Sequence, residues 1–293
     1  MLTLFRLLSR WPLWLLHALG AALGWLTWAL SPTYRRRLRD NAAQAGVAWR
    51  DARPAVAEAG RMAMELPWLW MRPADRPLGD KLQWQGGEHI EEAHRRGKGI
   101  LFLTPHLGCF EVTAQGYAER YGAARGPITV LYRPPRKASI RPVVETARRR
   151  PGLATAPATL AGVRQMIRAL RQGEAVGLLP DQVPPDGMGV WAPFFGRPAY
   201  TMTLAARLAQ QTGASIVLAW GERLRHGAGY VVHLAPFEQP LPEMAADQGQ
   251  SAAAAINRAM ERLILQCPGQ YLWGYHRYKQ PRRERAPATM ERA

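Results

Sequence analysis

A histidine and an acid five positions apart are the residues of this sequence best suited to chemistry. His106 directly follows a short apolar run, and Glu111 comes five residues later. Near neutral pH an imidazole can take the proton of a hydroxyl that attacks a carbonyl, as acyl transfer to an alcohol requires. A carboxylate on the other ring nitrogen would fix the tautomer and stabilise the imidazolium. The pattern therefore suits a catalytic pair, although a purely structural histidine fits the same spacing.

The local context decides whether these two side chains can meet. Five residues along an ideal helix turn the chain about 140° beyond a full revolution, so on one helix the two would lie on different faces. Here the run Gly99–Thr104 reads as a buried strand, and Pro105 and Gly108 mark a turn before a helical stretch. We therefore expect His106 at the end of a strand and Glu111 in the first turn of a helix, where its charge also favours the helix dipole.

Strand-like and helix-like stretches alternate along most of the chain. Further buried strands are expected at 128–132, 175–179 and 215–221. Helices are expected near 110–121, 139–150, 159–172, 201–212 and 251–266, and also over 33–72 with an interruption at Pro67. This alternation predicts an α/β fold with a mostly parallel central sheet flanked by helices. In such sheets the site lies beyond the carboxyl ends of the strands.

Two more charged residues follow predicted strands. Arg133 comes after the run at 128–132, and its guanidinium could clamp a substrate phosphate or stabilise a developing oxyanion. Asp181 comes after the run at 175–179, and its carboxylate could hold Arg133 in place or bind the acceptor. An Asx turn is the other common use of an aspartate after a proline. Both residues are candidates for substrate binding.

Less specific features lie nearby. Phe194, Phe195 and Gly196 form an apolar turn that suits a wall of an acyl-chain pocket and ordinary loop packing equally well. Cys109 lies inside the histidine motif, and we expect it to be a small buried thiol rather than a nucleophile. With Cys267 the only other cysteine, there is neither a CxxC pair nor a zinc pattern, so we expect no metal and a reducing compartment.

The N-terminal segment is apolar enough to enter a membrane. Residues 11–30 contain a single ionisable side chain, His17, and twenty residues in a helix span about 30 Å, the thickness of a bilayer core. Tryptophans lie near both ends, and arginines flank the segment with the heavier cluster after it. A buried core helix can have the same length, but we interpret residues 1–32 as a membrane anchor that spans or partly embeds. The basic cluster then places the main body on the cytoplasmic side.

Composition narrows the class of partner. The chain has 293 residues, 47% hydrophobic and 21% charged, which suits one large domain and not a polytopic membrane protein. Its net charge of +17 indicates an anionic partner. Eleven tryptophans favour a lipid boundary, and no nucleic-acid-binding fold is recognisable. Residues 33–280 then form the catalytic domain, and 281–293 a basic, disordered tail.

Four segments resemble, in order, those of the lipid A biosynthesis branch of the glycerolipid acyltransferase superfamily, the late (lauroyl/myristoyl-type) acyltransferases of Gram-negative bacteria. They are TPHLGCFE at 104–111, LYRP at 131–134, LPDQVPPDGMGVWAPFFG at 179–196 and YLWGYHRYK at 271–279. The resemblance covers nearly the full length. It implies a glycerol-3-phosphate acyltransferase-like fold, an acyl-acyl carrier protein donor, an anionic, phosphorylated disaccharide lipid as acceptor, and the bacterial inner membrane as the location.

The resemblance also implies roles for residues. By this match His106 is the general base and Glu111 its orienting partner, Arg133 and Asp181 bind substrate, and neither a metal, a cofactor nor a covalent acyl-enzyme is needed. Three alternatives remain open: a related acyltransferase acting on a lysophospholipid or another lipid acceptor, a hydrolase that uses the same pair on water, and a non-catalytic membrane protein that binds anionic lipid through its arginines.

Overall fold

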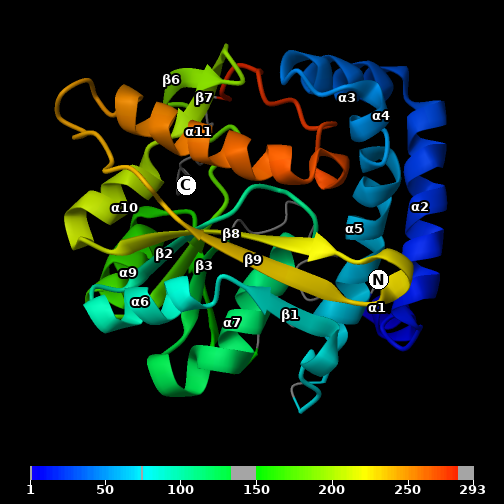
Figure 1. Ribbon diagram of the computed structural model, residues 1–293, viewed down its shortest axis with the longest axis horizontal. Coiled ribbons are helices and arrows are strands. Elements are labelled where there is room, and N and C mark those ends of the chain that lie inside the picture. Colours follow the sequence, from blue (N-terminus) through cyan, green and yellow to red (C-terminus); the bar gives the residue numbers. More distant parts are fainter. Residues whose placement is uncertain (1, 74, 133–149, 283–293) are drawn as a thin grey trace, which may run out of the picture.

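A central sheet organises the computed structural model, which describes residues 2–73, 75–132 and 150–282 (Figure 1). Seven strands of the described chain form it, in the spatial order β1 (Leu82–Gln85), β9 (Tyr230–Pro236), β8 (Ser215–Arg223), β2 (Ile100–Leu103), β5 (Ala175–Leu178), β3 (Ile128–Tyr132) and β4 (Leu153–Pro157). The strands from β8 to β4 run parallel, whereas β9 is antiparallel to β8 and β1 is parallel to β9. The predicted mostly parallel α/β sheet is therefore confirmed.

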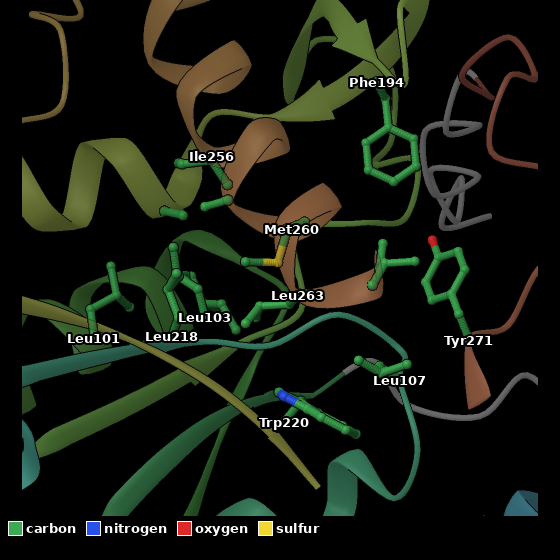
Figure 2. Close-up of a cluster of buried hydrophobic side chains, with 14 of the residues drawn as sticks. Leu101, Leu103, Leu107, Phe194, Leu218, Trp220, Ile256, Met260, Leu263 and Tyr271 are labelled. Carbon is green, nitrogen blue, oxygen red and sulfur yellow. The ribbon is translucent and has the colours of Figure 1, made fainter. Parts of the chain in front are cut away.

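Helices cover both faces of this sheet. On one face lie α6 (Glu88–Arg96) and α7 (Phe110–Arg125), and on the other α9 (Leu160–Arg171), α10 (Leu204–Thr212) and α11 (Gln250–Gln266). Successive side chains of a strand point to opposite faces, so Ile100 and Phe102 of β2 join the α6–α7 core while Leu101 and Leu103 join the other. Figure 2 shows this second core, with Met260 and Leu263 of α11 above Leu103.

The expected strands are all present, with some corrections elsewhere. Strands β1, β4 and β9, helix α6 and an antiparallel hairpin of β6 (Gly189–Phe194) and β7 (Arg197–Met202) were not anticipated. The helix expected from residue 201 begins only at Leu204, because Thr201 and Met202 belong to β7. The helix expected near 139–150 lies outside the described residues up to 149, and so does the tail from 283.

The N-terminal region is helical. It comprises α1 (Leu2–Leu8), α2 (Leu13–Leu30), α3 (Pro32–Gln44), α4 (Trp49–Ala52) and α5 (Ala55–Met71). Later in the chain lie three short 3-10 turns: η1 (Gly79–Lys81), η3 (Arg225–Gly227) and η4 (Pro268–Gln270). The expected interruption at Pro67 is wrong, since α5 runs through it. A proline removes one helical hydrogen bond, yet the helix continues through the buried Pro67.

Helices α2 and α5 form an antiparallel pair, visible side by side in Figure 1. Gly20 and Gly24 of α2 face Gly60 of α5 so closely that a Cβ on Gly60 would lie 1.9 Å from the carbonyl oxygen of Gly20. Among the described residues, α2 is the one helix long and apolar enough to cross a membrane. Its outward face exposes large apolar side chains: Trp14, Leu19, Leu23, Leu26 and Leu30.

Candidate active site

The carboxyl ends of β2 and β5 bring a histidine and an aspartate together. The two strands are parallel neighbours, and the N–H of Thr104 extends their pairing by donating to the carbonyl of Leu178 at 3.1 Å. His106 and Asp181, which follow the two strands, therefore emerge at the same edge. The Nδ1 atom of His106 lies 2.7 Å from Oδ1 of Asp181, and the backbone N–H of His106 donates to Oδ2 at 2.9 Å.

The two partners differ in exposure and charge. The Asp181 side chain is 2% exposed and that of His106 17% exposed. Burial by itself would raise the pKa of Asp181, but the charge and hydrogen bonds of His106, with the charge of Arg277, outweigh burial and lower this pKa. Asp181 is thus ionised at neutral pH and can only accept, so Nδ1 of His106 carries the proton. The lone pair of a neutral imidazole then lies on Nε2, as a general base requires.

A second layer of residues supports Asp181 from behind. Tyr271 lies beside it, and burial together with the Asp181 carboxylate raises the pKa of Tyr271 well above its ordinary value. Arg277 is 2% exposed and donates to the carbonyl of Tyr200 at 2.6 Å and to Oγ1 of Thr201 at 2.7 Å. Tyr271 and Arg277, from the aromatic and basic segment at 271–279, therefore form the buried surroundings of Asp181.

The loop that carries His106 is fixed by its backbone. Gly108 has φ +58°, and a Cβ there would lie 2.0 Å from the carbonyl oxygen of Gly221. Its N–H donates to the carbonyl of Gln270 at 3.0 Å. One residue earlier, Leu107 pairs with Tyr271 and reaches the core under α11 (Figure 2). Only glycine meets both the left-handed backbone and the close approach at position 108.

Cys109 is 1% exposed. Burial, followed by the charge of Glu65, raises its pKa well above the ordinary value for a thiol. It is therefore a neutral thiol at physiological pH, which does not suit nucleophilic attack.

In the structure, Nδ1 of His106 contacts Asp181, whereas the carboxylate expected from the sequence was Glu111. Glu111 lies in the first turn of α7, as predicted, and is half-buried. The described contact on Nδ1 of His106 is nevertheless with Asp181, for which we had expected substrate binding. The signal that could have found this pair is that both residues follow strands. The orienting role of Glu111 stays a prediction.

Two other expectations also remain predictions. Arg133 lies outside the described residues, directly after Tyr132, where β3 ends. Phe194 is buried against Arg277, and the N–H of Phe195 donates to Glu261 at 2.7 Å, so this turn is held by packing and hydrogen bonds. The cavity that Phe194 helps to line measures about 10 Å³, enough for one water molecule.

The imidazole of His106 and the buried carboxylate of Asp181 thus meet at the carboxyl edge of the α/β sheet, in the geometry that a general base requires. Comparison with known protein families identifies the family: the model of the family described as "Bacterial lipid A biosynthesis acyltransferase" matches residues 1–280. The chain belongs to this family and is an acyltransferase of lipid A biosynthesis.

Individual relatives agree with this assignment. The chain is 29% identical over 223 residues to the lipid A biosynthesis lauroyltransferase of Escherichia coli (strain K12), covering 75% of this chain and 68% of that protein. It is 26% identical over 215 residues to the palmitoleoyltransferase of the same organism, covering 73% and 66% respectively. It is also 26% identical over 215 residues to a lipid A biosynthesis acyltransferase of Shigella flexneri, covering 73% of this chain and 66% of that protein. The chain thus spans slightly less than two thirds of the latter two relatives.

Proposed function

We propose that this enzyme transfers a fatty acyl chain from acyl-acyl carrier protein to a hydroxyl of a phosphorylated lipid A precursor, with His106 as general base. The contact between Nδ1 of His106 and Asp181 carries the catalytic part of this proposal, because it leaves Nε2 as the basic atom of the more exposed partner. Family membership and the acyl-chain names of the relatives support the acceptor and the transferred group.

The proposed reaction needs one base and no covalent enzyme intermediate. Nε2 of His106 takes the proton of the acceptor hydroxyl as its oxygen attacks the thioester carbonyl, and Asp181 stabilises the imidazolium that forms. The tetrahedral oxyanion then collapses, the C–S bond breaks, and the imidazolium returns the proton to the leaving thiolate. The products are an ester and a free carrier-protein thiol.

Glu111 and Arg133 complete the proposal. Glu111 is retained as a catalytic carboxylate in the first turn of α7, the helix that follows the His106 loop. Arg133 is proposed to bind a phosphate of the acceptor, since a guanidinium can bind phosphate with two parallel hydrogen bonds. Phe194, Phe195 and Gly196 are proposed to lie along the path of the acyl chain.

Mass spectrometry of lipid A tests the proposed reaction directly. Cells that lack this protein are expected to make lipid A lighter by one acyl group, and the wild-type gene should restore the mass while a His106→Asn gene should not. An unchanged lipid A mass, with a change in phospholipids instead, would favour the lysophospholipid acceptor. Release of free fatty acid without any acceptor would favour a hydrolase.

We further propose that α2 embeds in the inner membrane by its outward face, with the catalytic domain on the cytoplasmic side. The inward face of α2 is occupied by α5, and His17 hydrogen-bonds Glu65 there at 3.2 Å. A helix crossing the bilayer alone would have to abandon this contact and the glycine packing. At the other end of α2, Arg35 and Arg39 lie over the ring of Trp28, at 5.2 and 5.3 Å from its centroid. Such aromatic and basic groups suit the lipid headgroup region.

The double substitution Leu23→Asp and Leu26→Asp is expected to weaken binding to vesicles that contain anionic lipid by at least about tenfold, because two half-exposed leucines lose their transfer to lipid. Leu160→Asp with Leu265→Asp is the matched control, since these leucines are 67% and 50% exposed on α9 and α11. Vesicle flotation measures both. Equal loss in the two double variants would contradict the assignment of the α2 face.

A further inference from the structure

A buried ionic network links the N-terminal helices to the loop that carries His106. Its centre is Arg223, at the end of β8, whose side chain is 1% exposed. The guanidinium donates to Glu58 through Nη1, and to Glu65 through both Nη2 and Nε, the last at 2.7 Å. Both carboxylates come from α5, so Arg223 is held at two positions that lie about two turns apart on one helix.

One atom of Arg223 also holds the loop that carries His106. Nη2, which binds Glu65, donates in addition to the carbonyl of Gly108 at 3.0 Å. Gly108 lies two residues after His106 and has the left-handed backbone described above. The carbonyl of Gly108 is therefore fixed by a charged donor, and such bonds are about twice as strong as neutral ones.

The main chain of Arg223 holds the same loop by a second route. Its N–H donates to Oε1 of Gln270 at 2.9 Å, and its carbonyl accepts from Nε2 of Gln270 at 2.9 Å. The carbonyl of Gln270 in turn accepts from the N–H of Gly108 at 3.0 Å. Both polar backbone groups of Gly108 thus depend on Arg223, one directly and one through Gln270.

The network continues to α2. Glu65 accepts from Tyr230 of β9 at 3.0 Å and pairs with His17 of α2 at 3.2 Å. Arg61 binds the other carboxylate, Glu58. These contacts place the two buried carboxylates against two guanidinium groups, those of Arg223 and Arg61.

We propose that Arg223 is a positioning residue for catalysis, which fastens the His106 loop to the α2–α5 helix pair through Gly108 and Glu65. It touches no reacting atom. Its effect on turnover rests on the proposed role of His106 as base, because a displacement of the loop would move Nε2 away from the acceptor hydroxyl. A misplacement of about 1 Å can lower turnover by about 10²-fold.

Arg223→Lys tests this role in the full-length enzyme. A lysine ammonium can still pair with Glu58 and Glu65, but it lacks the planar fork that reaches Gly108 at the same time. We expect kcat to fall by about 10- to 100-fold while KM for both substrates changes by less than about threefold. Arg72→Lys is the matched control: Arg72 is 6% exposed and pairs with Glu119 at 2.7 Å, without a described contact to the His106 loop. Its kcat should stay near that of the wild type.

Amide hydrogen exchange of residues 104–111 provides a readout that needs no substrate. Exchange in this segment should accelerate in Arg223→Lys and not in Arg72→Lys. A second variant, Arg223→Met with Glu58→Gln and Glu65→Gln, removes the buried charges together and should show the same loss of kcat. A folded Arg223→Lys enzyme with wild-type kcat and exchange would overturn the proposal. Failure of both Arg223 variants to fold would also overturn it, because the network would then be required for the stability of the fold and not for the position of the His106 loop.

The proposed function and this inference fail separately. Full acyl transfer by His106→Asn would refute the role of His106 as base and leave the exchange result intact. Inactive His106→Asn together with fully active Arg223→Lys would refute the positioning role alone.

Discussion

His106→Asn is expected to lower acyl transfer by about 10²- to 10⁴-fold without loss of the fold, the usual contribution of a positioned general base. The asparagine amide can still donate to the buried Asp181, so no carboxylate is left without its partner, but it cannot take the hydroxyl proton. The loss should appear in kcat, measured with purified enzyme and radiolabelled acyl donor. Circular dichroism and thermal unfolding check that the fold is retained.

A second histidine provides the control for this substitution. His233 pairs with Glu222 at 2.8 Å and stacks on Trp220 with ring centroids 4.4 Å apart, so it is also a histidine with a carboxylate partner. His233→Asn is expected to keep kcat within about threefold of the wild type, because it removes no base from the site. Full turnover by His106→Asn would remove the basis of the proposed mechanism.

Asp181→Asn is expected to cause the second large loss, again about 10²- to 10⁴-fold in kcat. In the native site both oxygens of Asp181 accept, one from Nδ1 and one from the backbone N–H of His106. An asparagine offers only one oxygen, so its NH₂ group must face one of these two donors. If the backbone N–H keeps the oxygen, the NH₂ group faces Nδ1 and the imidazole proton moves to Nε2. The atom that should accept the substrate proton is then blocked.

The ¹⁵N chemical shifts of the imidazole report this change of tautomer. They should change in Asp181→Asn and stay those of the wild type in Glu111→Gln, because the structure shows Asp181 on Nδ1. The opposite result, a changed tautomer in Glu111→Gln and an unchanged one in Asp181→Asn, would return the orienting role to Glu111. The two isosteric substitutions thus separate the carboxylate expected from the sequence from the one found in the structure.

Periodicity located the parts of the fold that have strong local patterns. The run ILFL of β2 is fully buried on both faces, so it reads as a continuous apolar segment, and the same holds for β5. Strands β1 and β4 are four and five residues long and only partly buried, so their patterns are weak. Thr201 and Met202 read as part of a helix because the apolar pattern of α10 extends backwards into β7.

The buried ion network shows what a local pattern cannot reveal. His17 lies in an apolar helix, Glu65 in a helix some fifty residues later, and Arg223 at the end of a strand. Each reads in isolation as an ordinary polar residue. The contact between His17 and Glu65 at 3.2 Å depends on the packing of α2 against α5. The contact between Arg223 and Glu65 at 2.7 Å depends on the position of α5 beside the end of β8. Helix packing is decided by side chains distant in sequence, and the glycines that permit it give no signal of their partner.

The sequence alone determined the α/β class, the strand that precedes His106, and the histidine as the candidate base, because burial and turn residues leave local periodic patterns. It also carried the family resemblance through motifs that are each contiguous. Only the tertiary structure decided that β5 lies next to β2 and therefore that Asp181, 75 residues away, holds Nδ1. Strand order is set by long-range packing of helices on both faces of the sheet, and no spacing along the chain encodes it.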